Sequence, residues 1–379
     1  MVRTLQLGMG WFAEAPGGLN RVFTELLQRL PETGVDVRGF VMGSGRVAEA
    51  TGARVRAVCS AQASLGRRWW RMRRHVADAL RADSITAVVT HFALYAFPVL
   101  DLLGERPLVV HFQGPWALES KREGAGELST MAKLALERAV YRRATACIVL
   151  SRAFRDVLQE VYGIDAGRIH VVPPGVDLGR FRPEGSRRQA RESLGWPTGR
   201  PIVLSVRRLA RRMGLPDLIA AAELVRRRCP DVLLLIGGAG QLRDELQGMI
   251  QARGLTHHVR LLGRIADEQL PLAYHAADLT VVPSVDWEGF GLVVLESLAA
   301  GTPVLVTPVG GLPETVEDLA PQLVLPKGGA DGVADGVARA LQGTLPLPSA
   351  EECRAFARAR YDWAVVADNV ATVYRQAVS

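Results

Sequence analysis

The fold is decided by one stretch, Ser284-Val285-Asp286-Trp287-Glu288-Gly289-Phe290-Gly291-Leu292-Val293-Val294-Leu295-Glu296. An apolar strand is predicted just before it, at 278–283, and apolar residues at helical spacing follow from Leu292 to Leu298. A strand, a glycine-containing loop and a helix in this order present backbone N–H groups and the positive end of a helix, which suit a phosphate. Glu296, further along the helix, would accept hydrogen bonds from sugar hydroxyls. The stretch therefore indicates a sugar nucleotide.

A second interpretation of the same stretch needs no ligand. Glu288 would then cap the helix, and Glu296 would lie on its solvent-exposed face. The longer pattern favours a ligand, because Glu-Gly-Phe-Gly-Leu-x-x-x-Glu at 288–296 is followed by Ala-Gly-Thr-Pro-Val at 300–304 and Gly-Gly-Leu-Pro-Glu at 310–314. This ordered series resembles the donor-site signature of the retaining GT-B glycosyltransferases of family 4 (glycosyl transferases group 1).

Length and composition are typical of a globular protein with two domains. With 379 residues, two domains of roughly 180 residues each are expected. No run approaches the roughly 20 apolar residues of a membrane-spanning helix, and residues 1–7 lack the apolar region of a signal peptide. The cysteines, at 59, 147, 229 and 353, form no C-x-x-C pair, which argues against a zinc site or a disulfide framework. A cytoplasmic location is therefore predicted.

The basic excess of the chain consists almost entirely of arginine. The net charge is +7, and only Lys121, Lys133 and Lys327 among the 46 basic residues are lysine. Beside so much alanine and glycine, this ratio is typical of a GC-rich genome, and no nucleic-acid partner is predicted. Any cation that contacts a phosphate in this protein is expected to be an arginine, which is permanently charged and bidentate.

Short apolar runs alternate with helical periods in both halves, which predicts parallel sheets covered on both faces. Strands are predicted at 4–8, 36–41, 87–91, 108–111 and 147–150, and in the second half at 202–206, 232–237, 259–262 and 279–282. The resemblance implies an α/β chain of GT-B architecture, with two doubly wound, Rossmann-like domains facing across a cleft. The predicted limits are an acceptor domain at 1–178, a linker at 179–200, a nucleotide-sugar donor domain at 201–360, and a C-terminal helix at 361–379 that crosses back to the first domain.

Two features of the first half are candidates for ligand contact. Gly17 and Gly18 open a helix after the first strand, where backbone would approach an anion closely, although an ordinary turn also explains them. His111 ends a strand, and His91 holds the analogous position one strand earlier, but a lone histidine is more often a structural residue. The resemblance implies that the Gly-Gly loop touches donor phosphate and acceptor, and that His111 lines the donor sugar as a catalytic residue. His91 is a candidate for the acceptor side.

The basic segment Arg207-Arg208-Leu209-Ala210-Arg211-Arg212-Met213-Gly214 follows the first strand of the second half. The family pattern is Arg-Leu, three residues and Lys-Gly, with both cations on the diphosphate. Arg208 and Gly214 match it, but Met213 occupies the lysine position. Arg212, one residue earlier, would supply the missing charge, and a solvated basic loop is the alternative. In Gly-Gly-Ala-Gly at 237–240, Gly238 is predicted either to pass close to the nucleotide or to form a plain turn.

The resemblance implies a role for each remaining candidate. Glu296 binds the ribose hydroxyls, Glu288 lies against the donor sugar as a catalytic residue without being a nucleophile, and Arg208 stabilises charge on the leaving diphosphate. The donor-binding loop is completed by Gly289, Phe290, Gly291 and Leu292. No D-x-D-like motif is visible, and arginines with helix N termini would do the work of a divalent ion. No metal and no cofactor other than the donor substrate is therefore expected.

The predicted function is metal-independent, retaining transfer of a hexose from a nucleotide diphosphate sugar to a hydroxyl group. The acceptor would be a sugar, a lipid-linked molecule or a small molecule, in the synthesis of a polysaccharide, glycolipid or glycoside. A GT-B sugar-nucleotide epimerase or hydrolase is the alternative, since it shares architecture and donor but needs no acceptor. A two-lobed sugar-binding protein would bind without turnover. Neither the nucleotide base nor the sugar is specified by any motif.

A basic helix is predicted at 65–80. One face of this helix is apolar, and it carries Trp69, Met72, Val76 and Leu80. The opposite face is basic, and it carries Arg67, Arg71, Arg74 and Arg81. The apolar face would pack on the first sheet. The stretch from Arg67 to Arg74, with Trp70 at its edge, would touch anionic lipid or an anionic acceptor, which adds the inner membrane face as a peripheral location.

Overall fold

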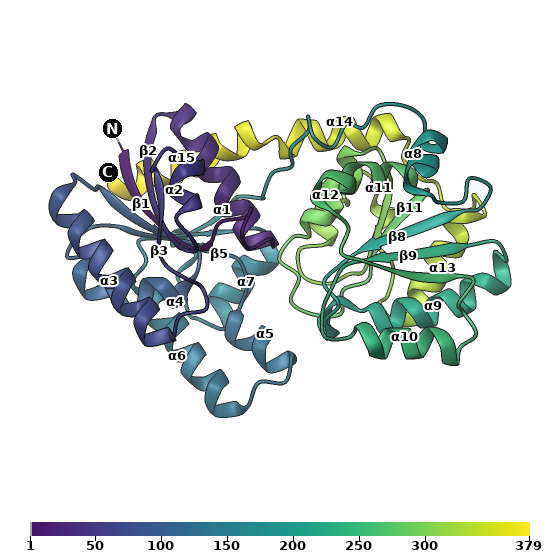
Figure 1. Ribbon diagram of the computed structural model, residues 1–379, viewed down its shortest axis with the longest axis horizontal. Coiled ribbons are helices and arrows are strands. Elements are labelled where there is room, and N and C mark those ends of the chain that lie inside the picture. Colours follow the sequence, from purple (N-terminus) through teal and green to yellow (C-terminus); the bar gives the residue numbers. More distant parts are fainter. Residues whose placement is uncertain (1) are drawn as a thin grey trace. The chain divides into compact units, whose positions relative to one another are not determined.

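Each half of the chain folds around one parallel β-sheet. The computed structural model describes residues 2–379, which divide into unit 1 (residues 2–174 and 363–379) and unit 2 (residues 175–362). Helices cover both faces of each sheet (Figure 1). This arrangement confirms the predicted α/β class with two doubly wound sheets.

The sheet of unit 1 is built around β1 (Val2–Gly10), which pairs in parallel with a strand on either side. The other strands are β2 (Val35–Met42), β3 (Val55–Cys59), β4 (Ala87–Thr90), β5 (Leu108–Phe112), β6 (Ala146–Val149) and β7 (Ile169–Val171). The seven strands follow the order β3-β2-β1-β4-β5-β6-β7. Every strand predicted in this half is present. The edge strand β3 was not predicted, because its apolar run is short and is interrupted by the exposed Arg56.

The helices of unit 1 lie on both faces of this sheet. They are α1 (Gly18–Arg29), α2 (Arg46–Ala50), α3 (Leu65–Ala82), α4 (Ala93–Ala96), α5 (Trp116–Arg122), α6 (Glu127–Arg143), α7 (Arg152–Glu160) and α15 (Trp363–Val378). Figure 1 shows α1 and α15 on one face and α3, α4 and α6 on the other. The last helix of the chain therefore packs on the first sheet.

Alternate side chains of β1 serve the two faces. Leu5 and Leu7 join the large apolar core that includes Met72 of α3. Gln6 points the opposite way, and its amide nitrogen lies 3.5 Å from the hydroxyl of Tyr374 on α15. The strand period of two thus places a polar side chain under the C-terminal helix.

The sheet of unit 2 is built around β8 (Ile202–Val206). Its other strands are β9 (Leu233–Gly237), β10 (Val259–Gly263), β11 (Leu279–Val282) and β12 (Val304–Val306), in the order β10-β9-β8-β11-β12. The helices are α8 (Arg187–Leu194), α9 (Leu215–Arg228), α10 (Arg243–Ala252), α11 (Leu270–Ala276), α12 (Leu292–Ala299), α13 (Gly329–Leu341) and α14 (Ala350–Tyr361). Figure 1 shows α9, α10 and α13 on one face and α11 and α12 on the other.

Residues 179–200, the predicted linker, contain α8 and form part of unit 2. Arg191 of α8 is buried, and its guanidinium donates to the carbonyl of Ala276 at 2.8 Å and to the carboxylate of Asp278 at 2.6 Å. An arginine-rich helix held by such polar contacts has little apolar periodicity, which is why its sequence looks like a linker.

Among residues 2–379, no helix combines the length and the apolar character that crossing a membrane requires.

Candidate active site

Three loops meet where β8, β9 and β11 end. Because β8 lies between the other two strands, the segments that follow them are neighbours. The backbone N–H of Arg207 donates to the carbonyl of Gly237 at 2.9 Å, and that of Val285 donates to the carbonyl of Arg212 at 3.0 Å. Ligands of open α/β sheets bind at the carboxyl ends of the strands. This edge of unit 2 is therefore the candidate site.

Two glycines allow these loops to pack closely. A Cβ at Gly238 would overlap the carbonyl oxygen of Arg207, and a Cβ at Gly214 would overlap that of Pro283. Gly214 also has a φ of 69°, in the left-handed region that glycine favours. Gly238 thus has a packing role, which is independent of any contact with a nucleotide.

The turn between β11 and α12 is hydrogen-bonded to a neighbouring loop. Trp287 has a φ of 44°, which is uncommon for a residue other than glycine. The carbonyl of Glu288 accepts a hydrogen bond at 2.9 Å from the N–H of Gly311, in the loop that follows β12. The helix begins at Leu292, as predicted, and its N-cap residue is Gly291, which has no side chain to cap the first turn.

Glu288 is a largely buried carboxylate paired with Arg207. Its side chain is 13% exposed, and it accepts hydrogen bonds from Nη2 of Arg207 and, at 3.0 Å, from Oγ of Ser284. Burial raises the pKa of Glu288, but the charge of Arg207 and its hydrogen bond outweigh that effect, so the pKa lies below its usual value. The group is ionised at neutral pH and is suited to accept hydrogen bonds, not to donate a proton.

The arginines after β8 are divided between the interior and the solvent. Arg207 is buried, whereas Arg208, the residue predicted to contact the diphosphate, is exposed. Nη1 of Arg212 donates to the carbonyl of Trp287 at 2.9 Å, and its charge also lowers the pKa of Glu288. Within residues 2–379, no hydrogen bond or ion pair joins Arg208 to Glu288. Arg207 was not predicted, because two consecutive arginines at a strand end give no signal of which one turns inward.

Glu296 is buried on α12, with 6% of its surface exposed. Its Oε2 accepts a hydrogen bond at 3.0 Å from the hydroxyl of Tyr274 on α11. The interpretation that places Glu296 on a solvent-exposed face is therefore wrong. A buried carboxylate on the helix that begins at the Glu288 turn is compatible with the predicted contact to ribose, which stays a prediction.

The remaining candidates in the loop have different surroundings. Phe290 is 3% exposed, and its ring packs edge-on against Tyr361 with centroids 5.6 Å apart, which is a core position. Gly291 has a φ of 82°, and a Cβ there would approach Leu312 to 2.8 Å. Gly289 is buried and Leu292 is half-buried at the first position of α12. These residues shape the turn, and their contact with a donor stays a prediction.

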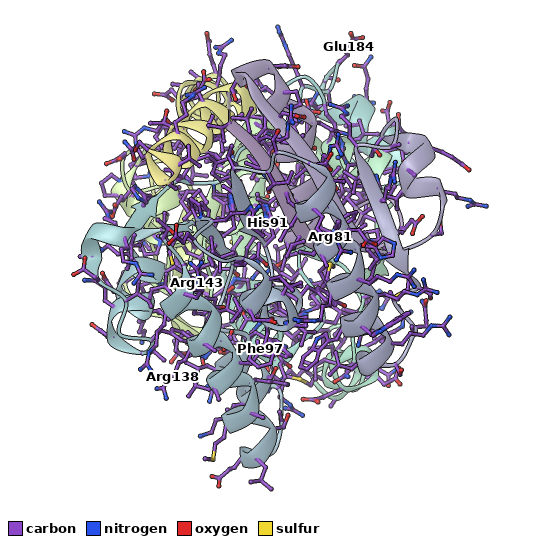
Figure 2. All side chains as sticks on the ribbon, turned by 90° about the vertical axis from the view of Figure 1, so that its left-hand side faces the viewer. Arg81, His91, Phe97, Arg138, Arg143 and Glu184 are labelled. Atoms are coloured by element: carbon purple, nitrogen blue, oxygen red, sulfur yellow. The ribbon has the colours of Figure 1, made fainter. Side chains whose placement is uncertain are left out.

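In unit 1, His111 and His91 stack on each other in the interior. Their ring centroids are 4.1 Å apart with an interplanar angle of 11°, and the residues are 4% and 1% exposed. Figure 2 shows His91 among the packed side chains of the unit. Burial lowers the pKa of His111 to about 3 and, together with the charge of His111, holds the pKa of His91 well below its usual value. Both imidazoles are therefore neutral at physiological pH.

Each ring has one hydrogen-bond partner at Nε2. His91 Nε2 lies 3.1 Å from Oε1 of Gln6, which only accepts, so Nε2 of His91 carries the proton. The amide nitrogen of Gln6 lies 3.5 Å from the hydroxyl of Tyr374, and that hydroxyl is hydrogen-bonded to His111 Nε2 at 2.7 Å. The structure thus gives His111 the hydrogen bond of a structural histidine, and its predicted contact with a sugar stays a prediction.

Gly17 and Gly18 lie at the start of α1. Gly17 has extended backbone, and a Cβ built on it would meet nothing within 4 Å. Packing therefore does not demand glycine at 17, in contrast to Gly238. The N-cap residue of α1 is Gly17, which has no side chain to cap the N–H groups of the first turn. Both observations are compatible with backbone that receives an anion.

Within residues 2–379, no group of three or more histidine, cysteine, aspartate or glutamate side chains is placed to hold a metal ion.

Two family profiles match this chain, one in each half. The profile described as Glycosyltransferase Family 4 matches residues 16–180, and the one described as Glycosyl transferases group 1 matches residues 186–361. The second match contains the whole of the candidate site described above.

Curated relatives are similar over part of their length. A D-inositol 3-phosphate glycosyltransferase of Nocardia farcinica is 40% identical over 230 residues, which are 58% of this chain and 50% of that protein. A GDP-mannose-dependent alpha-(1-6)-phosphatidylinositol monomannoside mannosyltransferase of Mycobacterium tuberculosis is 37% identical over 185 residues, 46% of this chain and 47% of that protein. The chain thus spans about half the length of the curated relatives it matches.

Solved structures share the fold over the whole chain. Anabaena Alr3699/HepE in complex with UDP and glucose superposes with a TM-score of 0.80 at 21% identity, covering 99% of this chain and 100% of that one. Sucrose-phosphate synthase from Thermosynechococcus elongatus superposes with a TM-score of 0.77 at 23% identity, covering 99% of each chain. These matches confirm the predicted GT-B fold.

Proposed function

Because the chain belongs to the family 4 glycosyltransferases (glycosyl transferases group 1), we propose that it transfers a hexose from a nucleotide diphosphate sugar to a hydroxyl group with retention of configuration. One observation carries the proposal. The ionised Glu288, paired with Arg207, lies in the turn that leads into α12, at the carboxyl edge of the second sheet. A carboxylate that accepts sugar hydroxyls and N–H groups that receive phosphate thus come from the same turn.

Each part of the site has a proposed role. The start of α12 and the cations near it bind the diphosphate, Glu288 holds hydroxyls of the transferred sugar, and Glu296 holds the ribose. Arg208 and Arg212 are the cations predicted for the diphosphate; of these, Arg212 contacts the turn, and Arg208 is exposed. In unit 1, the N terminus of α1 at Gly17 would receive phosphate.

The reaction breaks the bond between the anomeric carbon and the diphosphate oxygen and forms a bond to the acceptor oxygen. The acceptor proton passes to an oxygen of the leaving diphosphate, on the same face of the sugar, so the configuration is retained. Glu288 is ionised and held by Arg207 and Ser284, which suits it to position the sugar. Positive charge around the diphosphate stabilises the leaving group, which is where negative charge grows in the transition state.

Donor and acceptor are proposed from the relatives. One relative is named for GDP-mannose, and one solved structure with this fold contains UDP and glucose, so guanine and uracil nucleotides are the first candidates for the donor. The curated relatives are named for D-inositol 3-phosphate and for a phosphatidylinositol monomannoside. We therefore propose an acceptor with a polyol hydroxyl, carried on a phosphorylated small molecule or on a lipid.

The basic helix α3 is the proposed contact with a membrane surface. Its apolar face packs as predicted, with Met72 and Val76 buried in the core of unit 1. On the other side Trp70 is 55% exposed, and the guanidinium groups of Arg71 and Arg74 lie 5.3 and 5.8 Å from its ring. An exposed tryptophan between arginines suits a surface of anionic lipid. Binding to vesicles that contain anionic lipid should fall for Trp70→Ala with Arg74→Gln, and equal binding would contradict this contact.

The donor site is tested by ligand-induced stabilisation. Thermal melts of the wild type with UDP, GDP, ADP and TDP, each with and without EDTA, should show one nucleotide that stabilises the protein. A ligand at about 100 times its dissociation constant adds about 2.7 kcal/mol. Glu296→Ala should abolish the shift, because the buried carboxylate that binds ribose is gone. Glu351→Ala, which removes an exposed carboxylate on α14, is the matched control and should keep it. If no nucleotide shifts the melt, the proposal is wrong.

A further inference from the structure

Arg207 and Met213 lie together in a way that the sequence motif does not anticipate. Met213 occupies the place of the lysine in the pattern Arg-Leu, three residues, Lys-Gly, and it is buried, with 6% exposed. Nη2 of Arg207 lies 2.8 Å from its sulfur atom. A guanidinium from position 207 therefore lies next to the methionine that stands in place of the lysine.

We propose that Arg207 replaces the lysine absent at position 213 and binds the diphosphate of the donor, an inference that rests on the proposed function. The same nitrogen, Nη2, donates to Oγ of Ser284 at 2.7 Å and to Glu288, in the turn that leads into α12. Nε of Arg207 is buried and has no hydrogen-bond partner among residues 2–379. A guanidinium carries five N–H donors in a planar fork, so Arg207 holds Glu288 with one nitrogen and keeps donors for phosphate oxygens.

Contacts of the Arg207 backbone hold this residue in position. Its N–H donates to the carbonyl of Gly237, and its own carbonyl packs against Gly238, where no side chain fits. Arg207 is also the first residue after the central strand β8. A cation anchored in this way is preorganised, which is the property that stabilises a leaving group effectively.

Two cationic side chains, one at position 207 and one at position 213, would destabilise this buried place. A lysine at 213 would bring its ammonium beside the guanidinium of Arg207, in a buried place where like charges repel strongly. Methionine is unbranched and apolar, so it fills the space of a lysine stem without adding a charge. Arginine at 207 with methionine at 213 is therefore one compatible pair, and an apolar residue at 207 with lysine at 213 is the other.

This exchange can be tested with four proteins: the wild type, Arg207→Met, Met213→Lys, and the double variant that carries both changes. Titration calorimetry measures their affinity for UDP and GDP, and for UMP and GMP as probes without the second phosphate. Arg207→Met should weaken binding of the preferred diphosphate by about 10- to 100-fold, because a charged hydrogen bond is lost, and should change monophosphate binding much less. Met213→Lys alone should also weaken binding, because it places two cations together. The double variant should recover most of the loss.

The double variant keeps the test independent of folding. Arg207→Met leaves the carboxylate of Glu288 without its ion-pair partner and should lower the melting temperature. In the double variant, the lysine at position 213 places a cation near Glu288 again. Arg211→Met is the matched control, since Arg211 is exposed in the same loop and its ion pair with Glu245 has an N–O distance of 3.4 Å; its diphosphate affinity should equal that of the wild type.

Two results would overturn the role of Arg207. One is an unchanged diphosphate affinity in Arg207→Met. The other is a folded double variant that binds diphosphate no better than Arg207→Met. A wild type that binds no nucleotide diphosphate and transfers no sugar contradicts the proposed function itself. An active wild type with an unchanged Arg207→Met contradicts only the assignment of Arg207.

Discussion

Replacing Glu137 by glutamine should remove a pH dependence from the stability of unit 1. Glu137 lies on α6 with none of its surface exposed. It accepts hydrogen bonds from the hydroxyl of Tyr162 at 2.9 Å, from that of Tyr141 at 3.2 Å and from the N–H of Ala117 at 3.2 Å. Burial raises the pKa of Glu137 to about 7, against the opposing effect of these hydrogen bonds.

The sign of the effect follows from this raised pKa. In the unfolded chain the carboxyl group titrates near 4.5, whereas in the folded protein it keeps its proton up to about pH 7. The folded state therefore binds more protons between these values, and its stability is highest below pH 4.5 and falls as the pH rises to 7. At about 1.36 kcal/mol for each pKa unit, the loss amounts to roughly 3 kcal/mol. Glutamine does not titrate, so the variant should lack this loss.

Urea unfolding at a series of pH values between 4.5 and 8 measures the effect. Tryptophan fluorescence is a suitable signal, because Trp116 lies next to Ala117, whose N–H donates to Glu137. Subtracting the free energy of unfolding of Glu137→Gln from that of the wild type at each pH cancels the contribution of unit 2. Glu127→Gln, at an exposed position of the same helix, is the control and should follow the wild type. Equal pH dependence in wild type and Glu137→Gln would refute the reasoning.

Three further predictions concern the site. Tyr374→Phe removes the hydroxyl that is hydrogen-bonded to His111 and leaves a buried ring nitrogen unpaired, so we expect a loss of about 1–3 kcal/mol in urea unfolding and a lower kcat. Unchanged values for both would contradict the network. Gly238→Ala should lower the melting temperature and abolish nucleotide binding, because its Cβ would overlap the carbonyl of Arg207, whereas Gly248→Ala, with open space around it in α10, should raise stability by about 0.5–1 kcal/mol. EDTA should leave the rate of sugar transfer unchanged, since arginines and helix N termini are proposed to hold the diphosphate; a rate restored only by added magnesium would contradict metal independence.

The parts of the fold that could be predicted are those with strong periodic patterns. β8 was predicted with the bounds that the structure has, because a short apolar run is a local signal. α8 was missed, because its contacts come from Arg191 and Asp278, which leave no apolar period. A helix held by polar tertiary contacts cannot be recognised from hydrophobic spacing.

The candidate site was predicted in part for the same reason. Glu288 and Glu296 lie in a motif that is contiguous in sequence. The partners that define their chemistry come from elsewhere: Arg207 is 81 residues from Glu288. In unit 1, Tyr374 is 263 residues from His111, and nothing in the sequence near either residue indicates their contact. The direction in which a side chain points at a strand end depends on packing against loops such as Gly237–Gly240, which the sequence alone does not place.

The central claim is tested most directly by transfer of sugar to an acceptor. The protein is incubated with the donor sugar of the nucleotide that stabilises it and with inositol phosphate or vesicles of phosphatidylinositol, and the products are followed by NMR. The account predicts a new glycoside whose anomeric configuration matches that of the donor, formed only when the acceptor is present. An epimerised or hydrolysed donor with no glycoside, at the same rate with or without acceptor, would contradict it.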